Sequence, residues 1–289
     1  MIIDPKNTSV NEMYTTMVGS VMPRPIAFAS TISKDGNVNL SPFSFFNAFG
    51  SNPPVLIFSP AHRTRDNTPK DSYLNVKEHP EVVINMVDYT IAEQMSLSST
   101  EYERGVDEFE KSGLTAEASI KVKPPRVKES PVSYECKVLE VKSIGNSGGS
   151  ANLVICEVLL VHVKEELLNE KGYIDPYKAD LIGRLGGPYY TRITPDTIFT
   201  IKRPTKWKGI GVDSLPKNIK ESSVLTGSDL ARLGNLEMLP TQSEIDEYAK
   251  NKTSETDNFE ETHSKAKDLI RNGKELEAIK LLMSEKIKI

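Results

Sequence analysis

The chain has 289 residues, of which 38% are hydrophobic and 26% charged, as is ordinary for a globular protein. Its formal net charge of −4 argues against a nucleic-acid surface, and no apolar run is long enough to span a bilayer. The first ten residues include Asp4, Pro5 and Lys6 and no apolar block, so we expect no secretory signal and a cytoplasmic protein.

Two strands joined by a hairpin turn are predicted near the N-terminus. Residues 26–33 and 38–46 are rich in strand-forming side chains, and an Asp-Gly pair centres the turn between them. We therefore expect Thr31 and Ser41 to lie near one another across the hairpin.

The second of these strands carries polar features that a core strand rarely has. Pro42 cannot donate a hydrogen bond to a neighbouring strand, so we expect this strand to lie at a sheet edge or to contain a bulge. A bulge leaves backbone polar groups unpaired, and the Ser41 and Ser44 hydroxyls and the Phe45 ring lie beside them. A planar ligand such as a flavin needs a flat surface with polar groups of this kind. The alternative is an ordinary core strand.

A helix is predicted to begin at Pro69, with Thr68 as its N-cap. Lys70, Asp71 and Ser72 then lie on the first turn, where free N–H groups and the helix dipole favour an anion. Lys70 and Ser72 can contact a phosphate, whereas Asp71 would repel it and is expected to brace Lys70 or the helix start. The alternative is an ordinary capped helix.

Further strands and two loops are predicted in the middle of the chain. The segment 98–119 is long and polar, and such segments are often functional. Residues 145–150 form a Gly/Ser-rich hairpin loop, and no helix or lysine follows it to make a phosphate loop. Cys136 and Cys156 lie in apolar runs, and each is expected as a buried free thiol. The predicted strands are 55–59, 81–87, 132–144 and 153–163.

A glycine-rich segment follows at residues 181–190. It does not match a dinucleotide-binding fingerprint, because no strand leads into it with the required spacing and Pro188 blocks a helix. Arg184 in this segment is a candidate ligand contact. The alternative is a surface arginine on a turn.

The composition changes at Arg203, which predicts three parts: a barrel domain 1–202, an extended arm 203–242 and a helical tail 243–289. Within the tail, residues 251–257 are a polar break. Residues 259–272 and 274–286 are predicted as a helical hairpin around Gly273. The hairpin resembles one tetratricopeptide-type unit, but one copy is too few for a solenoid, so we expect it to pack on the barrel or on a partner subunit.

Several kinds of catalytic site are missing from the sequence. The two cysteines and four histidines lack zinc-site spacing, and neither a Gly-x-Ser-x-Gly elbow nor a Walker loop occurs. A strand-rich chain without a nucleophile or metal cluster indicates that a bound cofactor carries the reaction. We therefore assign no catalytic and no metal-binding residue.

A series of motifs resembles the flavin reductase-like, FMN-binding split-barrel family. The match covers about residues 8–240, and the helical hairpin lies outside it. Family members often have Thr after Lys-Asp, and Ser72 keeps the hydroxyl. The motifs are Pro23-Arg24-Pro25-Ile26-Ala27, Ser30-Thr31, Asn39-Leu40-Ser41-Pro42-Phe43-Ser44-Phe45-Phe46-Asn47, Pro53-Pro54, Lys70-Asp71-Ser72, and Gly183-Arg184-Leu185-Gly186-Gly187 with Tyr190.

The resemblance implies a mainly β fold: a six-stranded antiparallel split β-barrel with helical additions. It also implies a homodimer that holds FMN non-covalently near the subunit interface. Carried onto this chain, it assigns the flavin ring to Thr31 and to Ser41, Pro42, Phe43, Ser44 and Phe45. It assigns the phosphate to Lys70, Asp71 and Ser72, with Arg24 and Asn47 as further candidates.

The main functional hypothesis is an FMN-dependent oxidoreductase of the flavin reductase type. NAD(P)H would pass a hydride to the flavin, which would pass electrons to an acceptor, and Arg184 would stabilise the reduced flavin or the nicotinamide phosphates. One alternative is a flavoredoxin-type electron carrier with tightly bound FMN. Another is a non-enzymatic ligand-binding or interaction protein that uses the helical hairpin as its contact surface.

Overall fold

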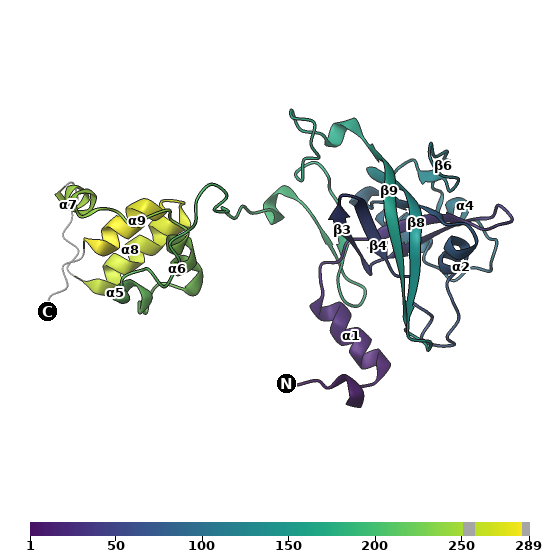
Figure 1. Ribbon diagram of the computed structural model, residues 1–289, viewed down its shortest axis with the longest axis horizontal. Coiled ribbons are helices and arrows are strands. Elements are labelled where there is room, and N and C mark those ends of the chain that lie inside the picture. Colours follow the sequence, from purple (N-terminus) through teal and green to yellow (C-terminus); the bar gives the residue numbers. More distant parts are fainter. Residues whose placement is uncertain (251–257, 285–289) are drawn as a thin grey trace. The chain divides into compact units, whose positions relative to one another are not determined.

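The computed structural model describes residues 1–250 and 258–284 (Figure 1). It divides into two compact units, Met1–Phe199 and Thr200–Ile289. The polar break predicted at 251–257 and the end of the helix predicted over 274–286 lie outside the described residues. None of the described helices has the length and apolar character needed to cross a membrane.

Within the described residues, seven antiparallel strands form the main sheet of the first unit, in the order β2-β1-β5-β8-β9-β4-β3. Two short strand pairs, β6 with β7 and β10 with β11, lie outside it. The strands are β1 (Ala27–Ile32), β2 (Val38–Phe43), β3 (Phe46–Ser51), β4 (Pro54–Phe58), β5 (Glu81–Asn85), β6 (Ala116–Glu117), β7 (Arg126–Val127), β8 (Val132–Ile144), β9 (Ala151–Val163), β10 (Ile182–Arg184) and β11 (Tyr190–Arg192).

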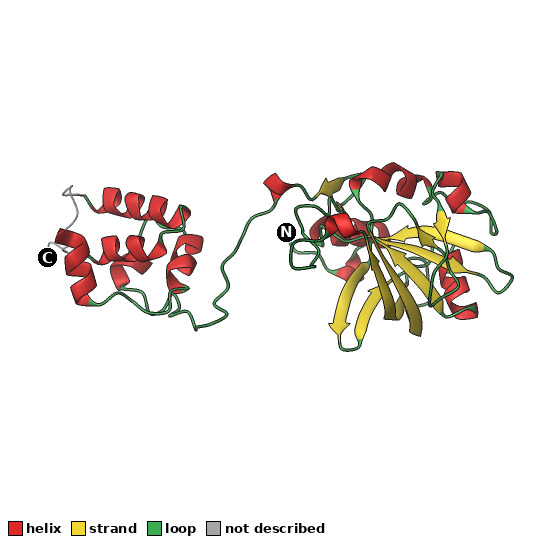
Figure 2. Ribbon diagram, turned by 90° about the horizontal axis from the view of Figure 1, so that it is seen from above, coloured by secondary structure: helices red, strands yellow, loops and turns green. Residues whose placement is uncertain are grey.

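The two ends of this sheet are joined by a link of only two residues. β2 and β3 lie at opposite ends of the strand order, yet only Ser44 and Phe45 separate them. Three Cα–Cα steps span at most about 11 Å, so the sheet has to curl until its edges meet. Figure 2 shows the strands, in yellow, fanning out as they curve. The stretch with the unusual polar pattern is therefore the seam of a barrel.

The seam corrects the predicted strand count. Residues 38–46, predicted as one strand, contain the edge strand β2 and the first residue of β3, which lies at the opposite edge. The sheet therefore holds seven strands where six were expected. The strand β3 was not among the predicted strands, because its side chains are largely exposed and give little apolar signal. The prediction that Pro42 places its strand at a sheet edge is confirmed, because β2 is the first strand in the order.

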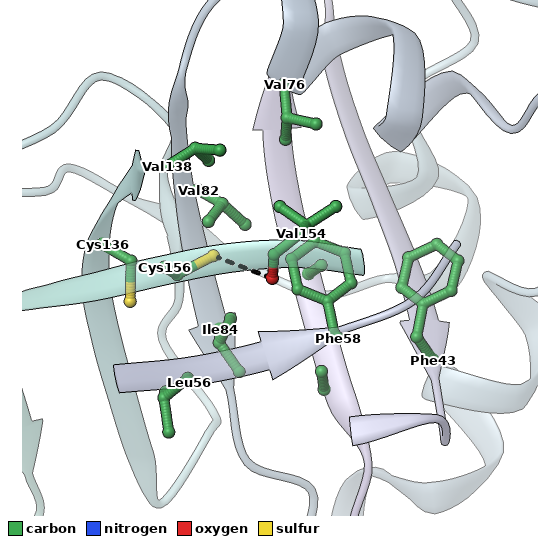
Figure 3. Close-up of a cluster of buried hydrophobic side chains, with 12 residues drawn as sticks. Phe43, Leu56, Phe58, Val76, Val82, Ile84, Cys136, Val138, Val154 and Cys156 are labelled. Atoms are coloured by element: carbon green, nitrogen blue, oxygen red, sulfur yellow. Dashed lines mark hydrogen bonds between the residues drawn. The ribbon is translucent and has the colours of Figure 1, made fainter. Parts of the chain in front are cut away.

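β1 is buried on both faces and β2 is partly buried, and alternate residues of each strand face the two sides of the sheet. Ala29 and Phe43 face a cluster inside the barrel, where the Phe43 ring lies beside Phe58 at 5.5 Å between centroids (Figure 3). Phe28 and Leu40 face a second cluster, which α3 and α4 help to cover. The helices of this unit are α1 (Val10–Ser20), α2 (Asp71–Glu78), α3 (Ala92–Leu97) and α4 (Glu108–Ser112), with short 3-10 helices at Pro5–Asn7, Tyr89–Ile91, Glu165–Leu167 and Pro195–Thr197.

The two cysteines lie inside the barrel cluster, where Figure 3 shows them on neighbouring strands. Both are buried and free, as predicted. Burial raises the pKa of Cys136 to about 12 and that of Cys156 well above its usual value. Both thiols therefore act as small apolar side chains.

The second unit is helical and has a core of its own. Its helices are α5 (Lys217–Lys220), α6 (Gly227–Gly234), α7 (Gln242–Lys250), α8 (Phe259–Arg271) and α9 (Glu275–Met283). α8 and α9 form the predicted hairpin, and Gly273 between them has φ +77°, which favours glycine. Leu215 and Ile219 from the predicted arm share one apolar cluster with Ile279 of the hairpin. The structure thus places much of the predicted arm and the tail in one unit.

Candidate functional site

The first turn of α2 carries three of the predicted site residues. The helix begins at Asp71, two residues later than predicted, and its N-cap is Lys70, which gives no side-chain cap. The Thr68 hydroxyl, predicted as the cap, donates instead to Asp66 at 2.6 Å. Within the part of the chain that the structure describes, the N–H groups of Asp71 and Ser72 have no hydrogen-bond partner. Free N–H groups at a helix start attract an anion.

A pocket opens at this end of α2. Ser41 of β2 lines it together with Lys70, Asp71 and Ser72. Other walls come from Arg63 and from the segment 98–102. The structure therefore brings together four of the predicted residues: Ser41 of β2, and Lys70, Asp71 and Ser72 at the start of α2.

Two cations line this pocket, Arg63 and Lys70, and Lys70 is the one without a partner in the described part of the chain. Its side chain is half-buried, and none of the described residues forms a hydrogen bond or ion pair with its ammonium group. Burial lowers the pKa of Lys70, and the nearby Arg63 adds to the effect. A bound anion would offset both effects on the pKa, since an opposite charge favours the protonated amine.

Arg63 forms the rim of the pocket and is held from two sides. Its Nη1 donates to the Pro69 carbonyl oxygen at 2.7 Å and to Thr68 Oγ1 at 3.3 Å. Its Nε lies 3.1 Å from Glu101 Oε1, and the other oxygen of Glu101 lies 3.2 Å from Arg65 Nη2. One carboxylate thus bridges two arginines beside the pocket.

Asp71 is used by the same neighbouring segment. Arg104 lies 3.7 Å from Asp71 Oδ1 and 3.5 Å from Glu78 Oε2. Charges of opposite sign therefore attach residues 98–107 to two neighbours: Glu101 pairs with arginines of the loop before α2, and Arg104 pairs with carboxylates of α2 itself. Asp71 was expected to brace Lys70 or the helix start, and its ion pair reaches across to Arg104.

A chain of hydrogen bonds forms the floor of the pocket. Ser72 Oγ donates to Asn39 Oδ1 at 2.7 Å, and Asn39 Nδ2 donates to Glu108 Oε1 at 2.7 Å. The Leu40 N–H donates to the other oxygen of Glu108 at 2.9 Å, which covers a backbone group of the edge strand. Burial raises the pKa of Glu108. The Ser72 hydroxyl proton therefore serves the protein, and Ser72 offers a ligand its backbone N–H.

Arg24 lies in a second group of predicted residues, at the seam. Its guanidinium donates to the carbonyl oxygens of Val18 at 2.7 Å, Val21 at 2.8 Å and Leu185 at 3.0 Å, and to Ser44 Oγ at 3.4 Å. Arg24 is buried, and these bonds tie α1 and the glycine-rich segment to the seam. The guanidinium of Arg24 therefore donates mainly to backbone carbonyl groups of the protein.

Phe45 and Arg184 lie close to Arg24. The Phe45 ring is 37% exposed and has the Tyr14 ring edge-on at 6.4 Å. Arg184 pairs with Arg24 through its backbone, donates to the Gly187 carbonyl oxygen at 2.8 Å and lies over the Tyr190 ring at 4.4 Å. Phe45 thus offers a partly open aromatic face at the seam.

The other residues predicted to contact a ligand are not among those that line the pocket at α2. Thr31 is fully buried and accepts a hydrogen bond from Asn75; it pairs with Asn39, while Ser41 pairs with Ala29 two residues along the same strand. Phe43 belongs to the barrel core. Pro42 lies opposite Phe28, and Asn47 is exposed on β3 with its Oδ1 accepting from the Ala48 N–H. Their roles toward a ligand stay predictions.

Eight residues of the pocket were not predicted as site residues from the sequence: Asn39, Arg63, Ser98, Ser99, Thr100, Glu101, Tyr102 and Glu108. Arg63 stands in a polar loop before the helix, and both glutamates lie in or near the long polar segment 98–119. The length of that segment was the signal, but its pairing with α2 depends on contacts between distant residues. Among residues 1–250 and 258–284, no three metal-ligating side chains gather in one place.

Comparisons with known proteins agree with this arrangement. The sequence profile of the flavin reductase like domain matches residues 18–178. An uncharacterized protein from Aquifex aeolicus is 43% identical over 187 residues, which are 65% of this chain and 93% of that protein. Nitrilotriacetate monooxygenase component B from Bacillus cereus is 28% identical with a TM-score of 0.65, covering 70% of this chain and 98% of its own.

A third protein bears on the fold. A protein with a split barrel domain from Shewanella frigidimarina is 24% identical with a TM-score of 0.59, covering 70% of this chain and 99% of its own. The predicted split-barrel fold is thereby confirmed. The matched segment 18–178 spans more than half of the chain and contains the whole main sheet and the pocket at α2. This chain therefore belongs to the flavin reductase-like domain family.

Proposed function

We propose that the protein is an FMN-dependent oxidoreductase of the flavin reductase type, which takes electrons from NAD(P)H and passes them to an acceptor. The observation that carries the proposal is the pocket at α2. It combines the Lys70 ammonium group, which has no partner among the described residues, a helix start without a side-chain cap, and Ser41 of β2. A phosphate ester is the ligand chemistry that these groups match.

The residues present fit the phosphate end of FMN. The Lys70 ammonium and the N–H groups of Asp71 and Ser72 are donors without acceptors in the described chain. A phosphate dianion accepts several such hydrogen bonds, each shorter and stronger than a neutral one. The anion would also remove the cost of a half-buried cation at Lys70.

The flavin ring is assigned to the seam. Residues 41–45 run from the pocket along β2 to the link with β3, and Phe45 offers a partly exposed ring there. When bound, FMN supplies the two-electron chemistry that side chains lack. The protein's part is to hold the phosphate, orient the ring and leave one ring face open to the nicotinamide. We assign no side chain as a general base.

The proposal includes a homodimer. On and beside α1, only Val18 is buried, while the apolar side chains of Val10, Tyr14, Met17 and Val21 are exposed. An exposed apolar face beside Phe45 supports a contact with a second copy that covers the seam. Light scattering of the purified protein tests this, and a monomer mass at micromolar concentration would refute it.

The experiment that tests the function is an anaerobic titration of the FMN-loaded protein. NADH and NADPH are added separately, and the flavin absorbance band is followed. We expect one nucleotide to bleach the band stoichiometrically and an added acceptor to restore it. A protein that takes up no FMN, or whose FMN neither nucleotide reduces, contradicts the proposal.

A further inference from the structure

Glu101 forms ion pairs with two arginines at the rim of the α2 pocket. Glu101 lies in the segment 98–107, and its two oxygens contact Arg63 Nε at 3.1 Å and Arg65 Nη2 at 3.2 Å. Hydrogen bonding from Arg63 is the largest effect that lowers the pKa of Glu101, and Lys70 also lowers it. Glu101 is therefore ionised at neutral pH, at the edge of the pocket where the proposed function places a phosphate.

Arg63 does not depend on Glu101 for its position. Its Nη1 donates to the Pro69 carbonyl oxygen at 2.7 Å, and Thr68 Oγ1 lies within 3.3 Å. The Arg63 side chain is 18% exposed, whereas that of Glu101 is 47% exposed. If the carboxylate were removed, the guanidinium would stay at the rim with its Nε free for another acceptor.

A carboxylate and a phosphate at this place compete for the same donor. Two like charges that share one small pocket also repel each other, and this repulsion is felt most where water is partly excluded. The pocket has two cations on its lining, Arg63 and Lys70, and Glu101 already occupies one of them.

We propose that Glu101 is a specificity-determining residue that weakens the hold on the flavin phosphate by occupying Arg63. This inference rests on the proposed function, because it takes the pocket at α2 as the phosphate site. Its consequence is an FMN that exchanges with solution, since the second cation of the pocket is neutralised from within the chain. The segment 98–107 thereby sets the affinity through the charge that it places beside the phosphate.

The test is Glu101→Gln in the full chain, a change that removes the charge and keeps the shape. Dissociation constants for FMN and for riboflavin are measured by quenching of flavin fluorescence at low and high salt. We expect FMN to bind about three- to tenfold more tightly to the variant at low salt, and the gain to shrink at high salt, where screening weakens such charges. Riboflavin has no phosphate, so its affinity should change less than twofold.

Glu103→Gln is the matched control. Glu103 lies two residues away in the same segment, is exposed, and its carboxylate makes no hydrogen bond or ion pair with the described residues. It should leave the FMN affinity within twofold of the unmodified protein. Inorganic phosphate should compete with FMN more strongly in Glu101→Gln than in Glu103→Gln.

The outcomes separate this inference from the proposed function. If the unmodified protein binds FMN and Glu101→Gln binds it equally or more weakly, the inference is overturned and the proposed function stands. An equal gain for riboflavin also overturns the inference, because the effect would not act through the phosphate. If the unmodified protein binds no FMN, the proposed function fails first. Glu101→Ala repeats the test if the glutamine variant does not fold.

Discussion

Replacing Lys70 with methionine separates the binding role of this side chain from its structural cost. The variant keeps the length of the side chain and removes the half-buried ammonium group, which has no partner in the described chain. We expect FMN affinity to fall, because a hydrogen bond from a charged donor to the phosphate contributes about 1.5–3 kcal/mol, or about 10- to 150-fold in affinity. Riboflavin affinity should stay unchanged.

The stability of the flavin-free protein should change in the opposite direction. The pKa of Lys70 in the folded state is lowered from 10.5, mainly by burial. A lysine whose folded pKa is lowered destabilises the protein while it is protonated, and this cost disappears as the pH rises through the lowered pKa. Lys70→Met should therefore raise the melting temperature near neutral pH, and the gain should vanish in alkaline solution.

The assay combines fluorescence titration with thermal unfolding, and Lys77→Met is its control. Lys77 lies on the last turn of the same helix, is exposed, and stands over the Tyr73 ring at 5.2 Å. A cation there stabilises the helix C-terminus, so its loss should lower stability slightly and leave FMN binding intact. Unchanged FMN affinity in Lys70→Met, or a loss equal to that in Lys77→Met, would refute the reasoning.

Three further predictions concern the scaffold. Cys136 and Cys156 should resist alkylation by iodoacetamide at pH 8 until the protein is unfolded, because both are buried and the pKa of Cys136 is about 12; rapid labelling of the native protein would contradict this. Arg24→Lys should cost about 2–4 kcal/mol in urea unfolding, since lysine lacks the planar fork that reaches three carbonyl groups; a loss below the error of the measurement would argue against that role. Ile279→Ala should destabilise the helical unit by about 2–5 kcal/mol, because this side chain is fully buried there, and flavin affinity should be unchanged; a parallel loss of flavin binding would show that the units depend on each other.

Features that depend on neighbouring residues were predictable from the sequence. Pro42 indicated an edge strand, and Gly273 indicated the turn of a helical hairpin. In each case the backbone chemistry of one residue limits the local structure. The resemblance of ordered motifs gave the family and the fold, and it named the four predicted residues that meet in the pocket.

Features that depend on distant residues were not predictable in the same way. The start of α2 moved because Asp66 takes the Thr68 hydroxyl and Arg63 takes the Pro69 carbonyl, so neither residue serves the helix as expected. The pairing of Arg63 with Glu101 joins residues far apart in the chain, and no local pattern signals it. The closure of the barrel at Ser44 and Phe45 depends on the order of all seven strands of the main sheet.

The most direct test of the central claim is a crystal structure of the protein grown with FMN. We predict phosphate oxygens within hydrogen-bond distance of Lys70 Nζ and of the N–H groups of Asp71 and Ser72, with the flavin ring along residues 41–45. A flavin whose phosphate lies away from the start of α2 would contradict it.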